Sequence, residues 1–377
     1  MPPKIVEVND RSPERDANVR EIADAMAQGA VVAFPTETVY GLGAAMAVPT
    51  AIERLVAAKG RAPEHPMAIA VSPSQAASLV SDPSETLRRL MRRCWPGPVT
   101  LVLNLSEAEP LRELMTEPTR QWTAPQGTVG FRVPQNATTL DVLDALGTPI
   151  VLTSANKTGE PELNDPQSIA EAFGDEIDLI VDDGSQPMGT PSTVVQVEGD
   201  DWKMLREGAV SKTIIQRLAA QITVFVCTGN TCRSPLAEVM FRRMAAERLG
   251  VAPEGLEAVG QVALSAGLAA AYGASASEGS LLAAHKRGLD LSGHQSQTLS
   301  DDMVHYADQI FTMTPTHREW ILSQHPEAAD RVETLAVGGD GVEDPYGGNT
   351  EDYERCAERI EREIAIRLDQ WNTDDAP

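Results

Sequence analysis

The chain has 377 residues, more than one hydrophobic core usually accommodates, so two domains are expected. Hydrophobic residues make up 42% and charged residues 23%, as in ordinary globular proteins, and the 4% aromatic content predicts aliphatic cores. The formal net charge of −24 argues against broad or strong binding to nucleic acids and anionic membranes, which both need a basic face.

The N-terminal residues contain no apolar targeting segment, and no apolar run approaches the ~20 residues of a membrane helix. The cysteines follow neither a disulfide framework nor a zinc-finger spacing; they are Cys94, Cys227, Cys232 and Cys356. We therefore expect a cytoplasmic protein with no membrane association and no metal site.

In chain order, residues 4–8 predict a strand, residues 18–28 an amphipathic helix, and residues 30–34 a buried strand. Hydroxyls, a carboxylate and glycines then follow over residues 35–43. Such residues just beyond a strand's carboxyl end are typical of an α/β ligand site, although they also suit an ordinary polar turn. A helix over residues 49–58 comes next.

Further strands are predicted after residues 95–100 and over residues 128–134, 150–156, 177–181 and 192–197, alternating with helices. This alternation predicts an α/β sheet. The sequence contains neither a P-loop motif nor a Rossmann fingerprint. Spacing alone therefore predicts no more than an α/β ligand-binding domain.

An ordered set of motifs spans this half and resembles the YrdC/Sua5 family of threonylcarbamoyl-AMP synthases over about residues 5 to 210. The set comprises residues 35–43, Lys59, Arg61, residues 95–98, Arg132, residues 154–156, residues 192–193 and residues 206–208. The resemblance implies a domain over residues 1–212 with a twisted mixed α/β sheet. It also implies that L-threonine, bicarbonate and Mg²⁺-bound ATP give threonylcarbamoyl-AMP and pyrophosphate. A downstream tRNA threonylcarbamoyl transferase would consume that adenylate.

By this resemblance, six residues would lie near ATP: Lys59, Arg61, Thr128, Asn156, Ser192 and Arg206. Three others would hold L-threonine: Thr36, Arg132 and Ser154. A few fixed cations and hydroxyls would then align a carboxylate with a triphosphate in one cavity. A non-catalytic RNA-binding module is the alternative interpretation, against which the acidic composition weighs.

A short helical linker is predicted over residues 213–221, and a second domain over residues 222–377. An apolar strand over residues 222–226 ends at Cys227, and Arg233 follows after five residues. Ser234 and Pro235 predict the N-cap and first residue of a helix. Backbone N–H groups at such a strand-to-helix corner bind oxyanions.

The loop between strand and helix contains Thr228, Gly229, Asn230, Thr231 and Cys232. The helix end and the nearby guanidinium favour the thiolate form of Cys227, which is a nucleophile. The planar fork of Arg233 suits two phosphate oxygens. A buried structural cysteine with a solvated arginine is the alternative reading of so short a motif.

Strands over residues 262–267 and 309–314 and helices over residues 277–288 and 352–368 follow. Residues 343–348 form a proline- and glycine-rich acidic segment that contains Asp344. Taken alone, this segment suits an ordinary turn.

Together these features resemble the low-molecular-weight protein tyrosine phosphatase family from residue 222 to the chain end. The resemblance implies a Rossmann-like parallel sheet and a cofactor-free reaction through a cysteinyl phosphate. Cys227 would be the nucleophile, Arg233 would bind phosphate, Asp344 would be the general acid, and Ser234 would help Cys227 to leave.

Phosphorylated proteins are the substrates that the resemblance implies. Members acting on phosphotyrosine carry a bulky aliphatic residue where this chain has Thr231, whereas the loop is similar to bacterial protein-arginine phosphatases. A small polar residue leaves room for a guanidinium, so we expect phosphoarginine, with phosphotyrosine as the alternative. Arsenate reduction would require a further reactive cysteine, for which Cys356 is the distant candidate.

Overall fold

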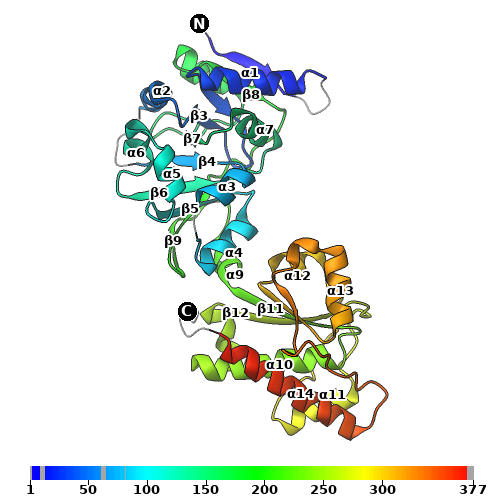
Figure 1. The fold of residues 1–377 in the computed structure, drawn as a ribbon. Coiled ribbons are helices and arrows are strands. Elements are labelled where there is room, and N and C mark those ends of the chain that lie inside the picture. The colour runs from blue at the N-terminus through cyan, green and yellow to red at the C-terminus, as the bar shows by residue number, and fades with distance from the viewer. Residues whose placement is uncertain (1, 9–12, 61–64, 81, 372–377) are drawn as a thin grey trace. The chain divides into compact units, whose positions relative to one another are not determined.

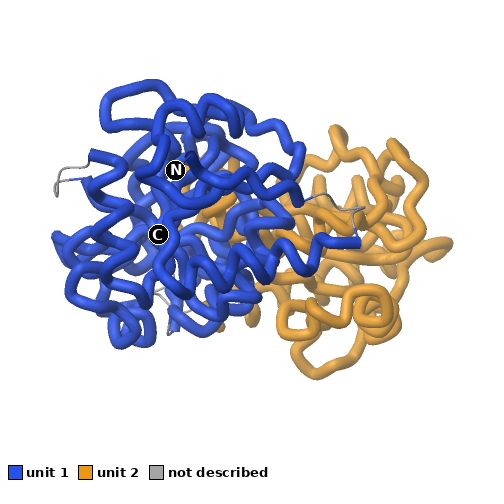
Figure 2. The backbone as a smooth tube through the Cα atoms, turned by 90° about the horizontal axis from the view of Figure 1, so that it is seen from above, with its two compact units in different colours: residues 1–215 blue, residues 216–377 orange. Residues whose placement is uncertain are grey.

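The computed structural model describes residues 2–8, 13–60, 65–80 and 82–371 (Figure 1). The chain divides into two compact units, Met1–Ile215 and Gln216–Pro377, coloured separately in Figure 2. The division falls inside helix α9 (Lys212–Ala219), within the segment expected to link two domains. No helix in the described ranges is both long enough and apolar enough to cross a membrane.

The first unit is built on a ten-stranded sheet with the order β1-β8-β2-β3-β7-β4-β6-β5-β9-β10. The strands are β1 (Lys4–Glu7), β2 (Val31–Phe34), β3 (Gly41–Ala45), β4 (Ala68–Ala70), β5 (Val99–Asn104), β6 (Thr128–Arg132), β7 (Ile150–Ser154), β8 (Leu179–Asp182), β9 (Thr193–Glu198) and β10 (Asp201–Arg206). The sheet contains parallel pairs such as β1·β8 and β5·β9 and antiparallel pairs such as β3·β7. The mixed sheet expected from the sequence is therefore confirmed.

Helices cover this sheet and connect its strands. They are α1 (Arg15–Ala27), α2 (Pro49–Lys59), α3 (Pro73–Leu79), α4 (Glu85–Cys94), α5 (Glu109–Leu114), α6 (Glu117–Thr123), α7 (Ala137–Leu146), α8 (Pro166–Phe173) and the 3-10 helix η1 (Gly174–Glu176). Helices α1 and α7 share one core cluster, in which Ile22 and Met26 pack with Leu143 and Phe34. This apolar packing holds both helices against the sheet.

Strand β3 was not expected from the sequence, in which residues 35–43 were treated as one loop. Its glycines let it pack closely between β2 and β7: a Cβ on Gly41 would lie 2.8 Å from Leu152 Cδ1, and a Cβ on Gly43 2.8 Å from Ile150 Cγ2. A glycine-rich strand carries little β-propensity, so the sequence pattern did not reveal it.

The second unit holds a parallel four-stranded sheet with the order β12-β11-β13-β14. The strands are β11 (Gln221–Cys227), β12 (Gln261–Gly267), β13 (Gln309–Thr312) and β14 (Val332–Thr334). The remaining elements are α10 (Arg233–Leu249), η2 (Pro253–Val259), α11 (Glu278–Lys286), α12 (Asp301–Tyr306), α13 (Pro315–Gln324), η3 (Pro326–Ala328) and α14 (Thr350–Asp369). The Rossmann-like parallel sheet is confirmed.

Helices lie on both faces of this sheet (Figure 1). Helices α10, α11 and α14 share a core with Phe225 and Phe311, whereas α12 and α13 pack through Val304 and Ile321 against Val224 and Ile310. The loops that follow β11 and β13 therefore meet at the carboxyl edge of a sheet buried on both sides, where α/β proteins bind ligands.

Candidate functional sites

A cavity of about 490 Å³ lies in the first unit, lined by residues of β3, β4, β5, β6, β7, β9 and β10. Six of the site residues expected from the sequence line it: Thr36, Thr128, Arg132, Ser154, Ser192 and Arg206. They come from segments far apart in the chain, so the fold brings together residues that the sequence analysis had linked only by resemblance.

Arg132 is held at the cavity by a buried ion pair. Its Nη2 lies 2.9 Å from Glu37 Oε1 and donates to Thr38 Oγ1 at 2.7 Å, and the two charged side chains are 8% and 12% exposed. The Thr38 hydroxyl is hydrogen-bonded to that of Thr36 at 3.0 Å. Arg132 Nε is buried without a hydrogen-bond partner among the described residues. An anion reaching this end of the cavity would find a fixed guanidinium.

Lys59 and Asn156 do not line the cavity themselves but support its wall. Lys59 Nζ donates to the backbone oxygen of Ser154 at 2.7 Å and is also hydrogen-bonded to Asn156 Oδ1. Ser154 Oγ donates to Asn156 Oδ1 at 2.7 Å. The three residues form one polar network at the end of β7. Arg61, expected beside them, lies outside the described residues.

Arg206 occupies another part of the cavity wall. Its Nε and Nη2 donate to the Ser192 backbone oxygen at 3.2 and 2.8 Å, and the Ser192 hydroxyl is hydrogen-bonded to Thr100 at 3.0 Å. Burial lowers the pKa of Arg206, which the charge of Glu162 partly opposes. Glu162 also lines the cavity, although its place in the sequence gave no signal of a role.

In the second unit, Cys227 ends β11 and is 2% exposed. Its Sγ lies 3.0 Å from Ser234 Oγ and accepts the backbone N–H of Asn230 at 3.3 Å. Asn230 adopts a left-handed conformation with φ of 52°, and its Nδ2 donates to Ser234 Oγ at 2.9 Å and to Ser265 Oγ at 3.0 Å. The loop therefore directs the Asn230 N–H at the sulfur, as expected of a loop that binds anions through its backbone.

The expectation that Ser234 caps a helix starting at Pro235 is wrong. Helix α10 begins at Arg233, and its N-cap residue, Cys232, makes no side-chain capping hydrogen bond. The Ser234 hydroxyl instead points to Cys227 Sγ and donates to Ala266 O at 3.2 Å. Pro235 still lies in the first turn, where its missing N–H costs nothing.

Arg233 and Asp344 meet beside this loop. Arg233 Nη1 donates to Val342 O at 3.1 Å, and Nη2 donates to Asp344 Oδ2 at 2.6 Å. Arg233 is 4% exposed, and its Nε is buried with no hydrogen-bond partner among the described residues. Nε and Nη2 lie along one edge of the guanidinium, which is the geometry that grips two oxygens of one oxyanion.

The other loop residues take different positions. Thr228 is exposed, Gly229 and Thr231 are half-buried, and Thr228 lines an open pocket together with Arg233, His317 and Asp344. Cys232 is buried, with Sγ donating to Ser277 Oγ at 3.2 Å. His317 is a pocket residue that the sequence analysis missed.

Cys356 is poorly suited to the redox role that arsenate reduction requires. It is buried in the core formed by α10, α11 and α14, and burial raises the pKa of its thiol to about 12. A thiol held protonated in an apolar core is a weak nucleophile.

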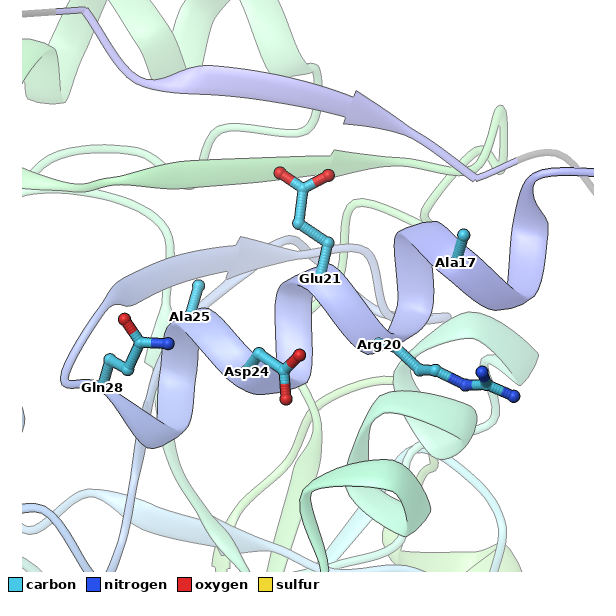
Figure 3. Close-up of a pocket in the computed structure, with 6 residues that line it drawn as sticks. All are labelled: Ala17, Arg20, Glu21, Asp24, Ala25 and Gln28. Atoms are coloured by element: carbon cyan, nitrogen blue, oxygen red, sulfur yellow. The ribbon is translucent and has the colours of Figure 1, made fainter.

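A third hollow lies along the outer side of α1 (Figure 3). It is lined by Ala17, Arg20, Glu21, Asp24 and Ala25 of this helix and by its C-cap residue, Gln28. The charged side chains point in different directions and do not converge on one point. We assign no ligand to it.

Both units match known families. Residues 24–208 match a family model described as "Telomere recombination", the Sua5/YciO/YrdC model, and residues 222–374 match "Low molecular weight phosphotyrosine protein phosphatase". A putative threonylcarbamoyl-AMP synthase of Mycobacterium tuberculosis (strain CDC 1551 / Oshkosh) is 30% identical over 52% of this chain and 87% of its own length. A protein-arginine-phosphatase of Geobacillus stearothermophilus is 33% identical over 40% of this chain and 96% of its own length.

The chain belongs to both families. Its synthase-family unit is also 33% identical to the threonylcarbamoyl-AMP synthase of Pyrococcus abyssi (strain GE5 / Orsay), over 58% of this chain, but the match spans only 62% of that relative's length. The structure of P. abyssi Sua5 complexed with L-threonine shares the fold at 24% identity, with a TM-score of 0.50, over 70% of this chain and 92% of that one. Both resemblances inferred from the sequence are thus confirmed.

Within the phosphatase-family unit, the structure brings the motif residues Cys227, Arg233, Ser234 and Asp344 to one place. Within the synthase-family unit, it brings six expected residues to one cavity. The functional roles of these residues remain predictions.

Proposed function

We propose that the chain carries two enzymes, a threonylcarbamoyl-AMP synthase followed by a cysteine-dependent protein phosphatase. For the first, the observation that carries the proposal is the single cavity that holds a cationic end at Arg132 and another at Arg206. The substrates are then L-threonine, bicarbonate and ATP as its magnesium complex. Threonylcarbamoyl-AMP would pass to a tRNA threonylcarbamoyl transferase.

Arg132, with Thr36 and Ser154, would hold the carboxylate end of threonine. Its unpaired Nε supports this assignment because a buried donor without a partner favours an anionic ligand. Arg206 and Ser192 would face the nucleotide, and Lys59, which lies behind the cavity wall with Asn156, would offset phosphate charge from there. Fixing both reactants in one cavity replaces a collision by an oriented approach.

The test is pyrophosphate release from ATP, with and without L-threonine and bicarbonate. We would use the full chain carrying Cys227→Ser, so that the second unit cannot hydrolyse the pyrophosphate that the assay measures. Release that requires all three substrates is expected. Failure to release pyrophosphate, together with salt-sensitive binding of duplex RNA, would instead support the RNA-binding alternative.

For the second unit, the observation that carries the proposal is Cys227 Sγ lying within 3.0 Å of Ser234 Oγ, at the start of a loop that Arg233 closes. The Cys227 sulfur would attack phosphorus as the bond from phosphorus to the leaving group breaks, and Asp344 would protonate the leaving group. Water would then attack the cysteinyl phosphate, giving its proton to Asp344 as the sulfur–phosphorus bond breaks. The Ser234 hydroxyl would stabilise the departing thiolate.

We propose phosphoarginine in proteins as the substrate. The half-buried Thr231 and the similarity to a protein-arginine-phosphatase support this choice. Phosphotyrosine is the competing candidate, which the 78% exposed Tyr346 beside Asp344 favours as an aromatic surface. A phosphoarginine peptide and a phosphotyrosine peptide should be compared with the wild type, Cys227→Ser and Thr231→Ile.

Preference for phosphoarginine that disappears in Cys227→Ser is the expected result, and Thr231→Ile should shift the preference towards phosphotyrosine. A wild-type preference for phosphotyrosine would retain the mechanism and exclude the substrate assignment. Absence of turnover on both peptides would exclude the phosphatase proposal.

A further inference from the structure

A buried histidine links two threonine hydroxyls at the open pocket that Arg233 and Asp344 line. His317 lies in the first turn of α13 and is 8% exposed. Its Nδ1 lies 3.0 Å from Thr314 Oγ1, and its Nε2 lies 2.9 Å from Thr228 Oγ1. His317 and Thr228 line the same pocket as Arg233 and Asp344.

The hydrogen-bond pattern favours one tautomer of this imidazole. Thr314 is the N-cap of α13, and its Oγ1 accepts the backbone N–H of His317 at 3.3 Å. Within the described part of the chain, His317 Nδ1 is the acceptor in reach of the Thr314 hydroxyl hydrogen. With the hydroxyl donating to Nδ1 both atoms are satisfied, and a neutral imidazole in this tautomer carries its proton on Nε2 and donates it to Thr228 Oγ1.

The surroundings keep this imidazole neutral. Burial, followed by the positive charge of Arg233, lowers the pKa of His317 to about 4, and the negative charge of Asp344 opposes them. A neutral imidazole accepts through one ring nitrogen and donates through the other, so it can relay a hydrogen bond from Thr314 to Thr228.

In this arrangement of hydrogen bonds, the Thr228 hydroxyl acts as an acceptor towards His317 and as a donor towards the pocket. Its oxygen accepts from His317, so its own hydrogen is available to an acceptor in the pocket. Thr228 is exposed there, and its side chain makes no other hydrogen bond among the described residues. The acceptor that the pocket would hold beside Arg233 is a phosphoryl oxygen.

We propose that the Thr228 side chain donates its hydroxyl hydrogen to a phosphoryl oxygen of the substrate, and that His317 is a positioning residue that orients this donor. The inference rests on the proposed phosphatase function and adds a side-chain contact to those of the loop backbone and Arg233. Hydrogen bonds to charged acceptors contribute about 1.5–3 kcal/mol, so losing this one should weaken phosphate binding by about 10- to 100-fold.

The test compares Thr228→Val with Thr228→Ser, and His317→Phe with His317→Gln, in the full chain. Inorganic phosphate is the probe, measured both by calorimetric titration and as a competitive inhibitor of peptide hydrolysis. Thr228→Val should raise the phosphate dissociation constant and KM by about 10-fold or more and change kcat little, because the contact exists in both ground and transition states. Thr228→Ser should restore most of the affinity.

His317→Phe should lose part of the same affinity, and His317→Gln should recover it because an amide nitrogen can donate to Thr228. The variant Thr228→Val/His317→Phe should bind phosphate no more weakly than Thr228→Val alone, since His317 acts through Thr228. Additive losses would overturn the inference, as would wild-type phosphate affinity in Thr228→Val.

Nitrogen NMR of the wild type gives a readout that no variant's folding can affect. The His317 ring should be neutral at pH 7 with its proton on Nε2, and a proton on Nδ1 would overturn the inference. Phosphate titration needs no turnover, so it distinguishes failure of this contact from failure of the proposed phosphatase activity.

Discussion

The Arg132–Glu37 pair allows stability and ligand binding to be separated in the synthase-family unit. Replacing Arg132 by Met keeps much of the side-chain volume but leaves the Glu37 carboxylate uncompensated in a site where it is 12% exposed. Removing one partner of a buried ion pair costs about 3–5 kcal/mol. With a urea slope of about 3 kcal/mol/M for a unit of this size, the unfolding midpoint should fall by about 1–2 M.

The matched variant is Arg132→Met combined with Glu37→Gln. Glutamine keeps an acceptor for the backbone N–H of Gln135, which Glu37 Oε2 accepts at 3.0 Å, and it carries no charge. Most of the lost stability should therefore return. L-threonine binding should be lost in both variants, because both lack the guanidinium.

The stability of this unit is measured by urea unfolding, monitored through the protection of β6 backbone amides from hydrogen exchange. L-threonine binding is measured by calorimetry. If the double variant were as unstable as Arg132→Met, the uncompensated charge would not be the cause. If Arg132→Met still bound L-threonine with wild-type affinity, the assignment of Arg132 to the carboxylate would be refuted.

Three further predictions concern the phosphatase-family unit. Ser234→Ala should slow breakdown of the cysteinyl phosphate, so that mass spectrometry of acid-quenched turnover finds phosphorylated Cys227 accumulating; no accumulation would count against the role of Ser234. Asp344→Asn should lower kcat on phosphopeptides by about 10²–10⁴-fold and lower it much less on an aryl phosphate whose leaving group needs no proton, and an equal loss on both would exclude Asp344 as the acid. Because burial and Arg233 lower the native pKa of His317 to about 4 from 6.5, its contribution to stability is complete above pH 6.5 and is lost as the pH falls towards 4. Urea unfolding should therefore show the wild type losing up to about 3 kcal/mol more than His317→Gln over that window, whereas parallel losses would contradict the lowered pKa.

Local patterns predicted much of this fold. The apolar run before Cys227 forms β11, and α10 starts six residues after it, because strand, loop and helix are set by neighbouring residues. The strand order of the ten-stranded sheet could not be predicted from local patterns, because β1 pairs with β8, which lies near the other end of the first unit in the sequence. Non-local pairing leaves no periodic signal in the sequence.

The site residues also divide into those that local motifs predicted and those that depend on distant partners. Residues in compact motifs, such as Cys227 and Arg233, could be assigned roles from the sequence by resemblance. Glu37 and His317 could not, because their partners Arg132 and Thr228 lie 95 and 89 residues away. Ser234 looked like a helix cap because its local sequence suits one, yet its hydroxyl donates to Ala266 O and lies 3.0 Å from the buried sulfur of Cys227.

The Arg233–Asp344 ion pair suggests how substrate binding and acid catalysis are coupled. Arg233 Nη1 is held by Val342 O, so the edge formed by Nε and Nη2 is the one that can take a phosphoryl group. Nη2 is also the atom that Asp344 contacts at 2.6 Å. We expect a bound phosphoryl group to compete with the carboxylate for Nη2 of this guanidinium. In the proposed mechanism, the freed carboxyl would lie beside a phosphoryl dianion, which would favour its protonated form for donation to the leaving group. In the absence of substrate, the same carboxylate compensates the charge of a guanidinium that is 4% exposed.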